Sequence, residues 1–147
     1  MTTVKSILKE KGNVVYSTTP DTPVFEALKL MAEKEIGALV VVESGRLVGI
    51  FSDRDYARKV ILKGKSSKNT PVKEIMTSEV VTVRPQQTIE ECLALMNRVR
   101  IRYLPVLEGK ELVGLLSIGD VAQAIIAEQE QELEKLENIG LGKNKLE

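Results

Sequence analysis

The chain has 147 residues, and its 21 Lys and Arg balance its 21 Asp and Glu, so the formal net charge is zero. The large basic excess of proteins that wrap nucleic acid is therefore excluded, and no apolar run approaches the roughly 20 residues of a membrane span. The single cysteine, Cys92, cannot form an internal disulfide. The N-terminal residues lack the apolar stretch of a secretory signal, so we expect a cytoplasmic protein with neither nucleic acid nor membrane as a partner.

The first half of the chain predicts a strand, a helix, a hairpin of two strands and a second helix. A helix is predicted by apolar residues at i, i+3, i+4 and i+7, which are Val24, Ala27, Leu28 and Met31. Thr22 is expected to cap this helix, and Pro23 fits its first turn. Two apolar runs follow at residues 38–42 and 47–51, and the polar residues between them predict a hairpin. The second helix is expected to begin at Ser52.

The second half predicts the same order after a polar linker at residues 64–71. Thr88 and Glu91 have the spacing of a capping box, in which each of the two side chains accepts a hydrogen bond from the other residue's backbone N–H. Residues 104–107 and 112–116 predict the second hairpin. The two halves of the chain therefore share one arrangement of elements.

The two halves are copies of each other in sequence as well. Residues 20–61 align with residues 85–126 at an offset of 65 residues without a gap, and 16 of the 42 aligned pairs are identical. Both copies contain the motif G-h-h-S-x-x-D, where h is apolar, so Ser52 and Ser117 each begin a helix directly after a strand. Self-similarity at a fixed offset indicates two copies of one structural unit.

Two copies of this order, each with the G-h-h-S-x-x-D motif, resemble the CBS domain, the module named after cystathionine β-synthase. The resemblance extends from about residue 4 to about residue 128 and is greatest with small stand-alone CBS-pair proteins. It implies an α/β (α+β) fold in which two pseudo-symmetric CBS repeats, each strand-helix-strand-strand-helix, form one CBS-pair module. We place repeat 1 at residues 4–63, the linker at 64–71, repeat 2 at 72–128, and a C-terminal helical extension and tail at 129–147.

The resemblance also implies two clefts between the repeats, in which adenosine-containing ligands bind. The first cleft combines the motif of repeat 1 with residues of repeat 2, and its members are Ser52, Arg54, Asp55, Ile101, Arg102 and Tyr103. The second combines the motif of repeat 2 with residues of repeat 1, and its members are Ser117, Asp120, Thr22, Ile36, Gly37 and Ala38. A carboxylate can accept both ribose hydroxyls, and a helix N-terminus offers N–H groups to a phosphate. A plain capping box is the alternative interpretation of each motif.

The two predicted clefts differ in charge. Arg54 lies inside the first motif, and its counterpart in repeat 2 is Gly119, while Arg102 corresponds to Gly37 of repeat 1. A guanidinium can hold a phosphate with two parallel hydrogen bonds. We therefore expect phosphate to bind in the first cleft, and the second to hold a less charged adenosyl group or to stay empty. A surface arginine paired with a nearby acid is the alternative role of Arg54.

A basic cluster precedes the second hairpin and contains Arg98, Arg100 and Arg102. Alternation within an extended segment would place Arg100 and Arg102 on the same side of the chain. We expect Arg102 to contact phosphate and Arg98 to be solvated.

The resemblance implies a non-catalytic regulatory or sensor module that binds AMP or another adenosine-containing nucleotide, such as ADP, ATP or NAD(H), with S-adenosylmethionine ranked behind them. With no effector domain on the chain, it is expected to act in trans on a protein target. The absence of histidine and the single cysteine also argue against an enzyme and against a metal site. The alternative is a ligand-free structural module for dimerisation and assembly. Degenerate motifs would be expected in that case, yet both motifs are intact.

Apolar residues on the predicted helices indicate a homodimer. Val60, Ile61 and Leu62 form a dense apolar run on the second helix of repeat 1, and Ile125 and Ile126 repeat it in repeat 2. Exposed apolar patches of this kind tend to mark an interface between chains.

The extension after repeat 2 continues the last helix, which is expected to end near Gly140. Alternating spacings of three and four residues favour a short helix–helix seam, formed by Ile126, Gln129, Leu133 and Leu136. A solvated, charged helix with a few apolar contacts explains the same residues equally well.

Overall fold

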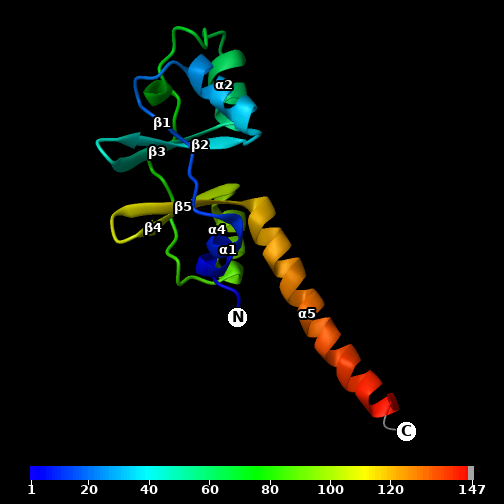
Figure 1. Ribbon diagram of the computed structural model, residues 1–147. Coiled ribbons are helices and arrows are strands. Elements are labelled where there is room, and N and C mark those ends of the chain that lie inside the picture. Colours follow the sequence, from blue (N-terminus) through cyan, green and yellow to red (C-terminus); the bar gives the residue numbers. More distant parts are fainter. Residues whose placement is uncertain (146–147) are drawn as a thin grey trace. The chain divides into compact units, whose positions relative to one another are not determined.

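The computed structural model describes the backbone of residues 1–145 and the side chains of residues 1–140 (Figure 1). Residues 146–147, the end of the predicted tail, lie outside the described residues. Helices and strands are mixed along the chain, which confirms the predicted fold class. The elements in chain order are α1 (Val4–Lys11), β1 (Ser17–Thr18), α2 (Val24–Lys34), β2 (Ala38–Glu43), β3 (Arg46–Ser52), α3 (Asp53–Tyr56), the π-helix η1 (Ala57–Ile61), the 3-10 helix η2 (Val72–Glu74), α4 (Ile89–Val99), β4 (Tyr103–Glu108), β5 (Glu111–Ser117) and α5 (Ile118–Lys145).

The two repeats contain the predicted order of elements with local differences. Repeat 1 has β1, α2, β2, β3 and α3, and repeat 2 has α4, β4, β5 and α5. The first strand of repeat 2 is reduced to one parallel bridge between Val83 and Val106, and Val83 is the counterpart of Thr18 at the 65-residue offset. The helix expected from Ser52 is four residues of α-helix followed by the five-residue π-helix η1.

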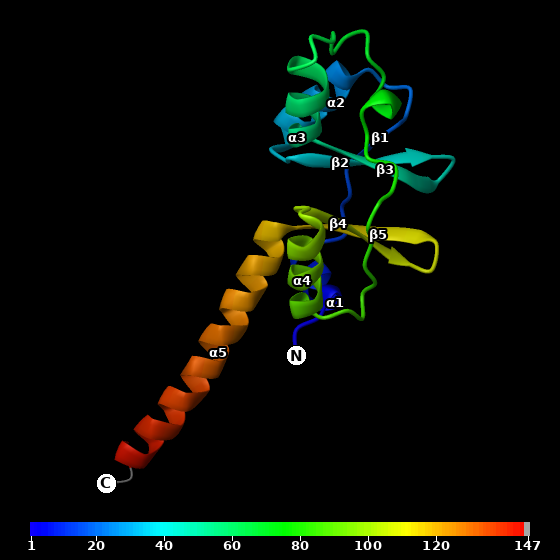
Figure 2. The ribbon, with the colours of Figure 1, turned by 180° about the vertical axis from the view of Figure 1, so that it is seen from behind.

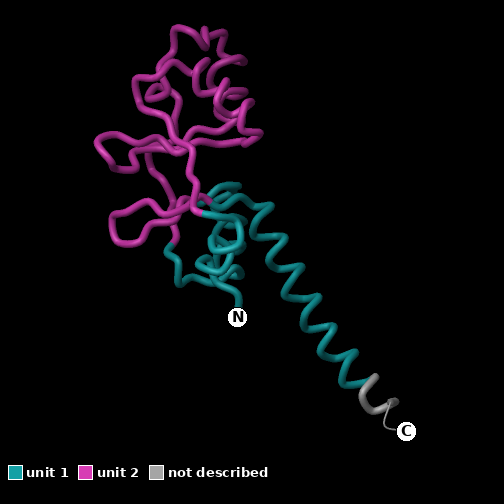
Figure 3. The backbone as a smooth tube through the Cα atoms, viewed as in Figure 1, with its two compact units in different colours: residues 1–12, 84–104, 116–147 teal, residues 13–83, 105–115 magenta. Residues whose placement is uncertain are grey.

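The chain forms two compact units, each made from separate segments (Figure 3). Unit 1 contains residues 1–12, 84–104 and 116–147, and unit 2 contains residues 13–83 and 105–115. Helix α1 therefore belongs to the same unit as α4 and α5, although it comes before the first hairpin in sequence. The units differ from the sequence repeats, whose boundaries remain a prediction.

The sheet of unit 2 sets the position of the first S-x-x-D motif. Strand β2 lies between β1, which is parallel to it, and β3, which is antiparallel. The turn between β2 and β3 consists of Ser44 and Gly45, with φ of 52° and 77°, and a type I′ hairpin turn requires such positive values at both positions. The resulting register pairs Ala38 with Ser52. The end of β3 therefore lies beside the start of β2.

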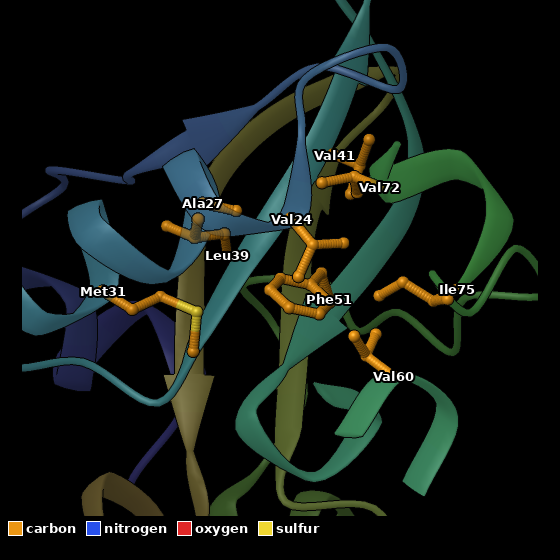
Figure 4. Close-up of a cluster of buried hydrophobic side chains, with 9 residues drawn as sticks. All are labelled: Val24, Ala27, Met31, Leu39, Val41, Phe51, Val60, Val72 and Ile75. Atoms are coloured by element: carbon orange, nitrogen blue, oxygen red, sulfur yellow. The ribbon is translucent and has the colours of Figure 1, made fainter. Parts of the chain in front are cut away.

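The core of unit 2 is an aliphatic cluster around one aromatic ring (Figure 4). Phe51 is fully buried and lies among Val24, Val60 and Ile75. Burying an aliphatic or phenyl side chain stabilises a fold by about 1.5–3 kcal/mol relative to leaving it exposed. The cluster comprises Val24, Ala27, Met31, Leu39, Val41, Phe51, Val60, Val72 and Ile75.

Val60 was expected on an exposed apolar patch, and this prediction is wrong. Its side chain is 1% exposed and belongs to the core of unit 2, whereas the adjacent Ile61 and Leu62 are 55% and 77% exposed. Val60 and Ile61 are the last residues of η1 and Leu62 is its C-cap, so successive side chains point in different directions and the three cannot share a face. Of these three residues, Ile61 and Leu62 remain available to a partner.

The start of α2 also differs from the prediction. Pro23 occupies the N-cap position, so Thr22 does not cap the helix. The first N–H groups of the helix donate instead to backbone carbonyls, from Val24 to Thr70 over 2.8 Å and from Phe25 to Ser67 over 2.9 Å. These bonds satisfy donors that a helix N-terminus otherwise leaves open. Backbone carbonyls of the predicted linker segment thus replace a capping side chain as the acceptors.

Unit 1 contains the helices α1, α4 and α5 (Figures 1 and 2). The backbone joins the start of α1 to the segment before α4, because Val4 N–H donates to Gln87 O and Lys5 N–H to Pro85 O, both over 2.9 Å. Helix α4 begins with the predicted capping box of Thr88 and Glu91, which is confirmed. The buried apolar residues of this unit are Val4, Ile7, Leu8, Ile89, Cys92, Met96, Leu104, Leu116 and Val121.

Helix α5 runs well beyond the rest of unit 1. Both views show its first turns beside α4 and the remainder extending away (Figures 1 and 2). The helix continues through Gly140 to Lys145, so the expected end near Gly140 is wrong. Ile126, Leu133 and Leu136 are 54%, 57% and 67% exposed, as a solvated helix would have them in a single chain. Within residues 1–145, no helix is both long and apolar enough to cross a membrane.

Candidate functional site

The first S-x-x-D motif lies in unit 2, where β3 ends at Ser52 and α3 begins. The Ser52 hydroxyl accepts the Asp55 N–H over 3.3 Å, and Asp55 Oδ2 accepts the Ser52 N–H over 2.9 Å, which is a reciprocal capping box. Lys59, four residues after Asp55, places Nζ 3.2 Å from Asp55 Oδ1. The Asp55 carboxylate is therefore fixed at a helix N-terminus, with its side chain 14% exposed.

The second motif lies in unit 1, where β5 ends at Ser117 and α5 begins. Its backbone bonds match those of the first motif, with Ser117 N–H donating to Asp120 Oδ2 over 2.8 Å and Asp120 N–H to Ser117 Oγ over 3.1 Å. The cation differs, because Lys11 of α1 places Nζ 2.6 Å from Asp120 Oδ2. Burial acts to raise the pKa of Asp120, but the hydrogen bonds from Lys11 and Ser117 and the charge of Lys11 outweigh it and hold that pKa below its ordinary value.

Both motifs therefore have the capping-box geometry that was the alternative interpretation of each. Capping does not occupy every acceptor position of the carboxylate. At Asp120, the backbone N–H of the cap and the Lys11 ammonium both contact Oδ2. A carboxylate has about four lone-pair positions on its two oxygens. The aspartates can thus serve as caps and still offer acceptor positions to a ribose.

Each motif lies beside the start of the first hairpin strand of its own repeat. In unit 2, Asp53 N–H donates to Gly37 O over 3.0 Å. In unit 1, Ile118 N–H donates to Arg102 O over 2.8 Å. The predicted sites pair each motif with the strand start of the other repeat and so draw residues from both units. That pairing remains a prediction.

Thr22 lies apart from the other residues of unit 2 that were assigned to the second cleft. It precedes α2, whereas Ile36, Gly37 and Ala38 follow it. Helix α2 has 11 residues, which corresponds to a length of about 16 Å at 1.5 Å per residue. The Thr22 carbonyl accepts the Val72 N–H over 2.8 Å, at the end of α2 opposite to Gly37.

The arginines do not form one extended row. Arg100 is the C-cap of α4 in the left-handed conformation, with φ of 56°, so the alternation argument that placed it beside Arg102 is wrong. Arg102 is half-buried, with Cζ 5.7 Å from the centre of the Tyr103 ring, which is within the range of a cation–π contact. Arg98 is exposed in the last turn of α4, as expected, and Arg54 is exposed on α3.

The repeated architecture is matched by known proteins. The family model of the CBS domain matches residues 4–62 and 72–127. The chain belongs to the CBS domain family. CBS pairs generally serve as regulatory modules that bind adenosine-containing ligands.

Similar CBS proteins occur among plants and bacteria. The mitochondrial CBS domain-containing protein CBSX3 of Arabidopsis thaliana is 42% identical over 145 residues, which cover 92% of this chain and 70% of the relative. A solved structure of a protein with CBS domains from Burkholderia ambifaria MC40-6 has a TM-score of 0.84 and 52% identity, covering 87% of this chain and 96% of that one. A hexameric CBS-CP12 protein from bloom-forming cyanobacteria has a TM-score of 0.74 and 31% identity, covering 82% and 70%.

Two lysines at the CBS motifs were not identified from the sequence. Lys59 has a local signal, because an acid and a lysine four residues later pair on one helix face. Lys11 lies 109 residues from Asp120 and has no such signal. The one hint is that repeat 2 has Ala124 at the position of Lys59, so its aspartate lacks the local lysine.

Proposed function

We propose that this CBS pair is a non-catalytic sensor of adenine nucleotides that acts in trans on a protein target. The observation that supports it most strongly is the same strand–serine–aspartate–helix junction, formed twice with matching hydrogen bonds. In each junction a carboxylate is held at a helix N-terminus, where ribose hydroxyls can donate to it and the positive end of the helix attracts a phosphate. AMP, ADP, ATP and NAD(H) contain both groups, and S-adenosylmethionine contains only the ribose.

Apart from Thr22, the proposed sites keep the residue sets that the family implies. The first would use Ser52, Arg54 and Asp55 with residues 101–103, and the second Ser117 and Asp120 with residues 36–38. We place Thr22 outside the contact set, because it lies at the other end of α2 from Gly37. We further propose a cytoplasmic location, which a reduced, disulfide-free chain supports.

The test is thermal unfolding with AMP, ATP, NAD or S-adenosylmethionine. A ligand that binds only the folded state stabilises it by about 2.7 kcal/mol at a concentration 100 times Kd, so we expect AMP, ATP or NAD to raise Tm. An unchanged Tm with all four compounds at millimolar concentration would contradict the proposal and would favour the ligand-free assembly module.

Charge-removing variants then show whether the aspartates are the recognition groups. Asp55→Asn and Asp120→Asn keep an oxygen for the cap, and each is expected to weaken nucleotide binding by roughly tenfold, as for loss of one charged hydrogen-bond partner. Glu91→Gln is the matched control, because Glu91 makes the same capping box on α4 outside the motifs. Titration calorimetry showing equal affinity for the double aspartate variant and the Glu91→Gln control would show that these residues are caps only.

A further inference from the structure

The ion pair between Lys11 and Asp120 joins two elements that lie far apart in sequence within unit 1. Lys11 is the last residue of α1, and its ammonium contacts the motif carboxylate at the start of α5 over 2.6 Å. The side chains are 38% and 22% exposed, so the pair is open to solvent and to a solute. It differs from a mobile surface pair in that both elements are fixed.

The backbone of α1 holds Lys11 in place. The helix is tied to residues 85–87 at its start, and its apolar residues Val4, Ile7 and Leu8 are buried. At the other side of the unit, Thr2 N–H donates to Glu128 Oε2 of α5 over 3.3 Å. The packing of α1 thus positions the Lys11 ammonium beside Asp120, independently of any ligand at the motif.

Repeat 1 satisfies the equivalent aspartate in another way. Asp55 pairs with Lys59. The Lys59 ammonium also donates to the carbonyl of Ile75 over 3.1 Å, so both of its contacts lie within unit 2. The counterpart of Lys59 in repeat 2 is Ala124, and the counterpart of Lys11 in repeat 2, at the 68-residue offset of the leading segments, is Glu79. The lysine that pairs with the motif aspartate thus follows the motif in repeat 1 and comes from α1 in repeat 2.

The short side chain of Ala124 leaves room for this exchange. A pocket of about 450 Å³ that opens to solvent lies between helices α1 and α5, and it is lined by Ile7, Glu10, Lys11, Asp120, Gln123, Ala124 and Ala127. The cation and the carboxylate therefore both face a space large enough for a phosphate group, and the whole arrangement lies within unit 1.

We propose that Lys11 is the phosphate-selecting residue of the Asp120 site. The inference rests on the proposed function and specifies it: when ribose hydroxyls bind the Asp120 carboxylate, the Lys11 ammonium lies beside the bound nucleotide, where it attracts an anion. The 5′-phosphate of AMP supplies that anion, and adenosine does not. The second site would therefore prefer charged nucleotides, contrary to the expectation that it holds a less charged group. The low pKa of Asp120 agrees with this arrangement, because it keeps the carboxylate ionised near neutral pH.

The test compares AMP with adenosine in an Asp55→Asn background, in which Asp120 is the remaining motif aspartate. We expect AMP to bind about tenfold more tightly than adenosine, which corresponds to about 1.4 kcal/mol. Lys11→Met should weaken AMP binding toward that of adenosine, while adenosine binding stays equal or tightens because the carboxylate is no longer shared. Lys11→Arg should keep the preference.

Lys9→Met is the matched control, because Lys9 is an exposed lysine of the same helix turn. A merely structural role of Lys11 would weaken both ligands together, so an unchanged ratio of AMP to adenosine affinity in Lys11→Met overturns this inference alone. If the unmodified protein binds ATP or NAD but neither AMP nor adenosine in calorimetry, this inference fails alone. If it binds none of the four compounds, the proposed function fails and this inference fails with it.

Discussion

At the scale of single residues, Asp55 and Asp120 occupy the same position of their motifs and differ in the lysine that each holds. Lys59 pairs with Asp55 within one helical segment, whereas Lys11 pairs with Asp120 across 109 residues of sequence. A local pair contributes mainly to its own helix, and a long-range pair also resists separation of the two elements that it joins. The Asp120 pair therefore links the charge state of one carboxylate to the docking of α1.

This link predicts a pH dependence of stability. The pKa of Asp120 in the folded protein is below its ordinary value of about 3.9, so its ion pair stabilises the fold above that value and the contribution is lost as the pH falls through the folded pKa. Urea unfolding should therefore show a lower midpoint for Asp120→Asn than for the unmodified protein at pH 7. The difference should shrink below about pH 4. A difference that is the same at pH 7 and pH 2.5 would contradict this assignment.

At the scale of elements, the hairpin of unit 2 is packed closely against the segment after η2. A Cβ added at Gly49 would lie 2.6 Å from Met76 Sδ and 3.1 Å from Thr77 O. The methionine side chain can move, but Thr77 is fixed by reciprocal backbone bonds to Ile50 of 2.9 and 3.0 Å. The backbone of this hairpin thus has no space for a side chain at Gly49.

We accordingly expect Gly49→Ala to destabilise the protein by about 1–3 kcal/mol, as overpacking of a filled interior does. Gly119→Ala is the control, because the nearest atom to its added Cβ, Ser117 Oγ, would be at an ordinary contact distance of 3.5 Å. It should be neutral or slightly stabilising, since alanine favours a helix by up to about 1 kcal/mol over glycine. Equal urea midpoints for the two variants would show that the residues around Gly49 can make room for a methyl group without loss of stability.

The regular elements could be predicted from the sequence because their signals are local. The i, i+3, i+4, i+7 spacing of Val24 to Met31 marks α2, and the Thr88 to Glu91 spacing marks the start of α4. The repeat supported these predictions, since the hairpin and the S-x-x-D junction each occur twice in the sequence. These features depend on residues within one or two turns of each other.

The features that were missed depend on contacts between distant segments. Thr22 does not cap α2 because residues 67 and 70 supply carbonyls to its first N–H groups. Val60 is buried because η1 turns it toward Phe51, and Lys11 reaches Asp120 because α1 docks in unit 1. Gly140 failed as a stop signal because glycine only weakens a helix, by about 1 kcal/mol, and does not end it.

At the scale of the whole molecule, each unit leaves large apolar side chains in solvent. Leu62 of unit 2 is 77% exposed and Ile126 of unit 1 is 54% exposed. Exposed apolar residues of this kind favour association of chains. We propose that this protein forms a homodimer through such residues.

Light scattering at micromolar concentration is expected to give twice the chain mass of 16.3 kDa. Leu62→Glu or Ile126→Glu should shift the protein toward the single-chain mass, because a buried charge in an interface is costly. Val14→Glu is the control, since Val14 is 73% exposed but stands outside both apolar runs. A species of 16.3 kDa for the unmodified protein would rule out the dimer.

The membership of α1 in unit 1 has a consequence for the order of events during synthesis. The buried residues Val4, Ile7 and Leu8 are made before every segment that shelters them, and Val121 of α5 follows Lys11 by 110 residues. At a translation rate of about 5–20 residues per second, α1 waits roughly 5–20 s outside the ribosome with its apolar face open. Chaperones have that interval in which to bind it. Helix α1 is thus made before the other helices of its unit and is buried only after they have followed it.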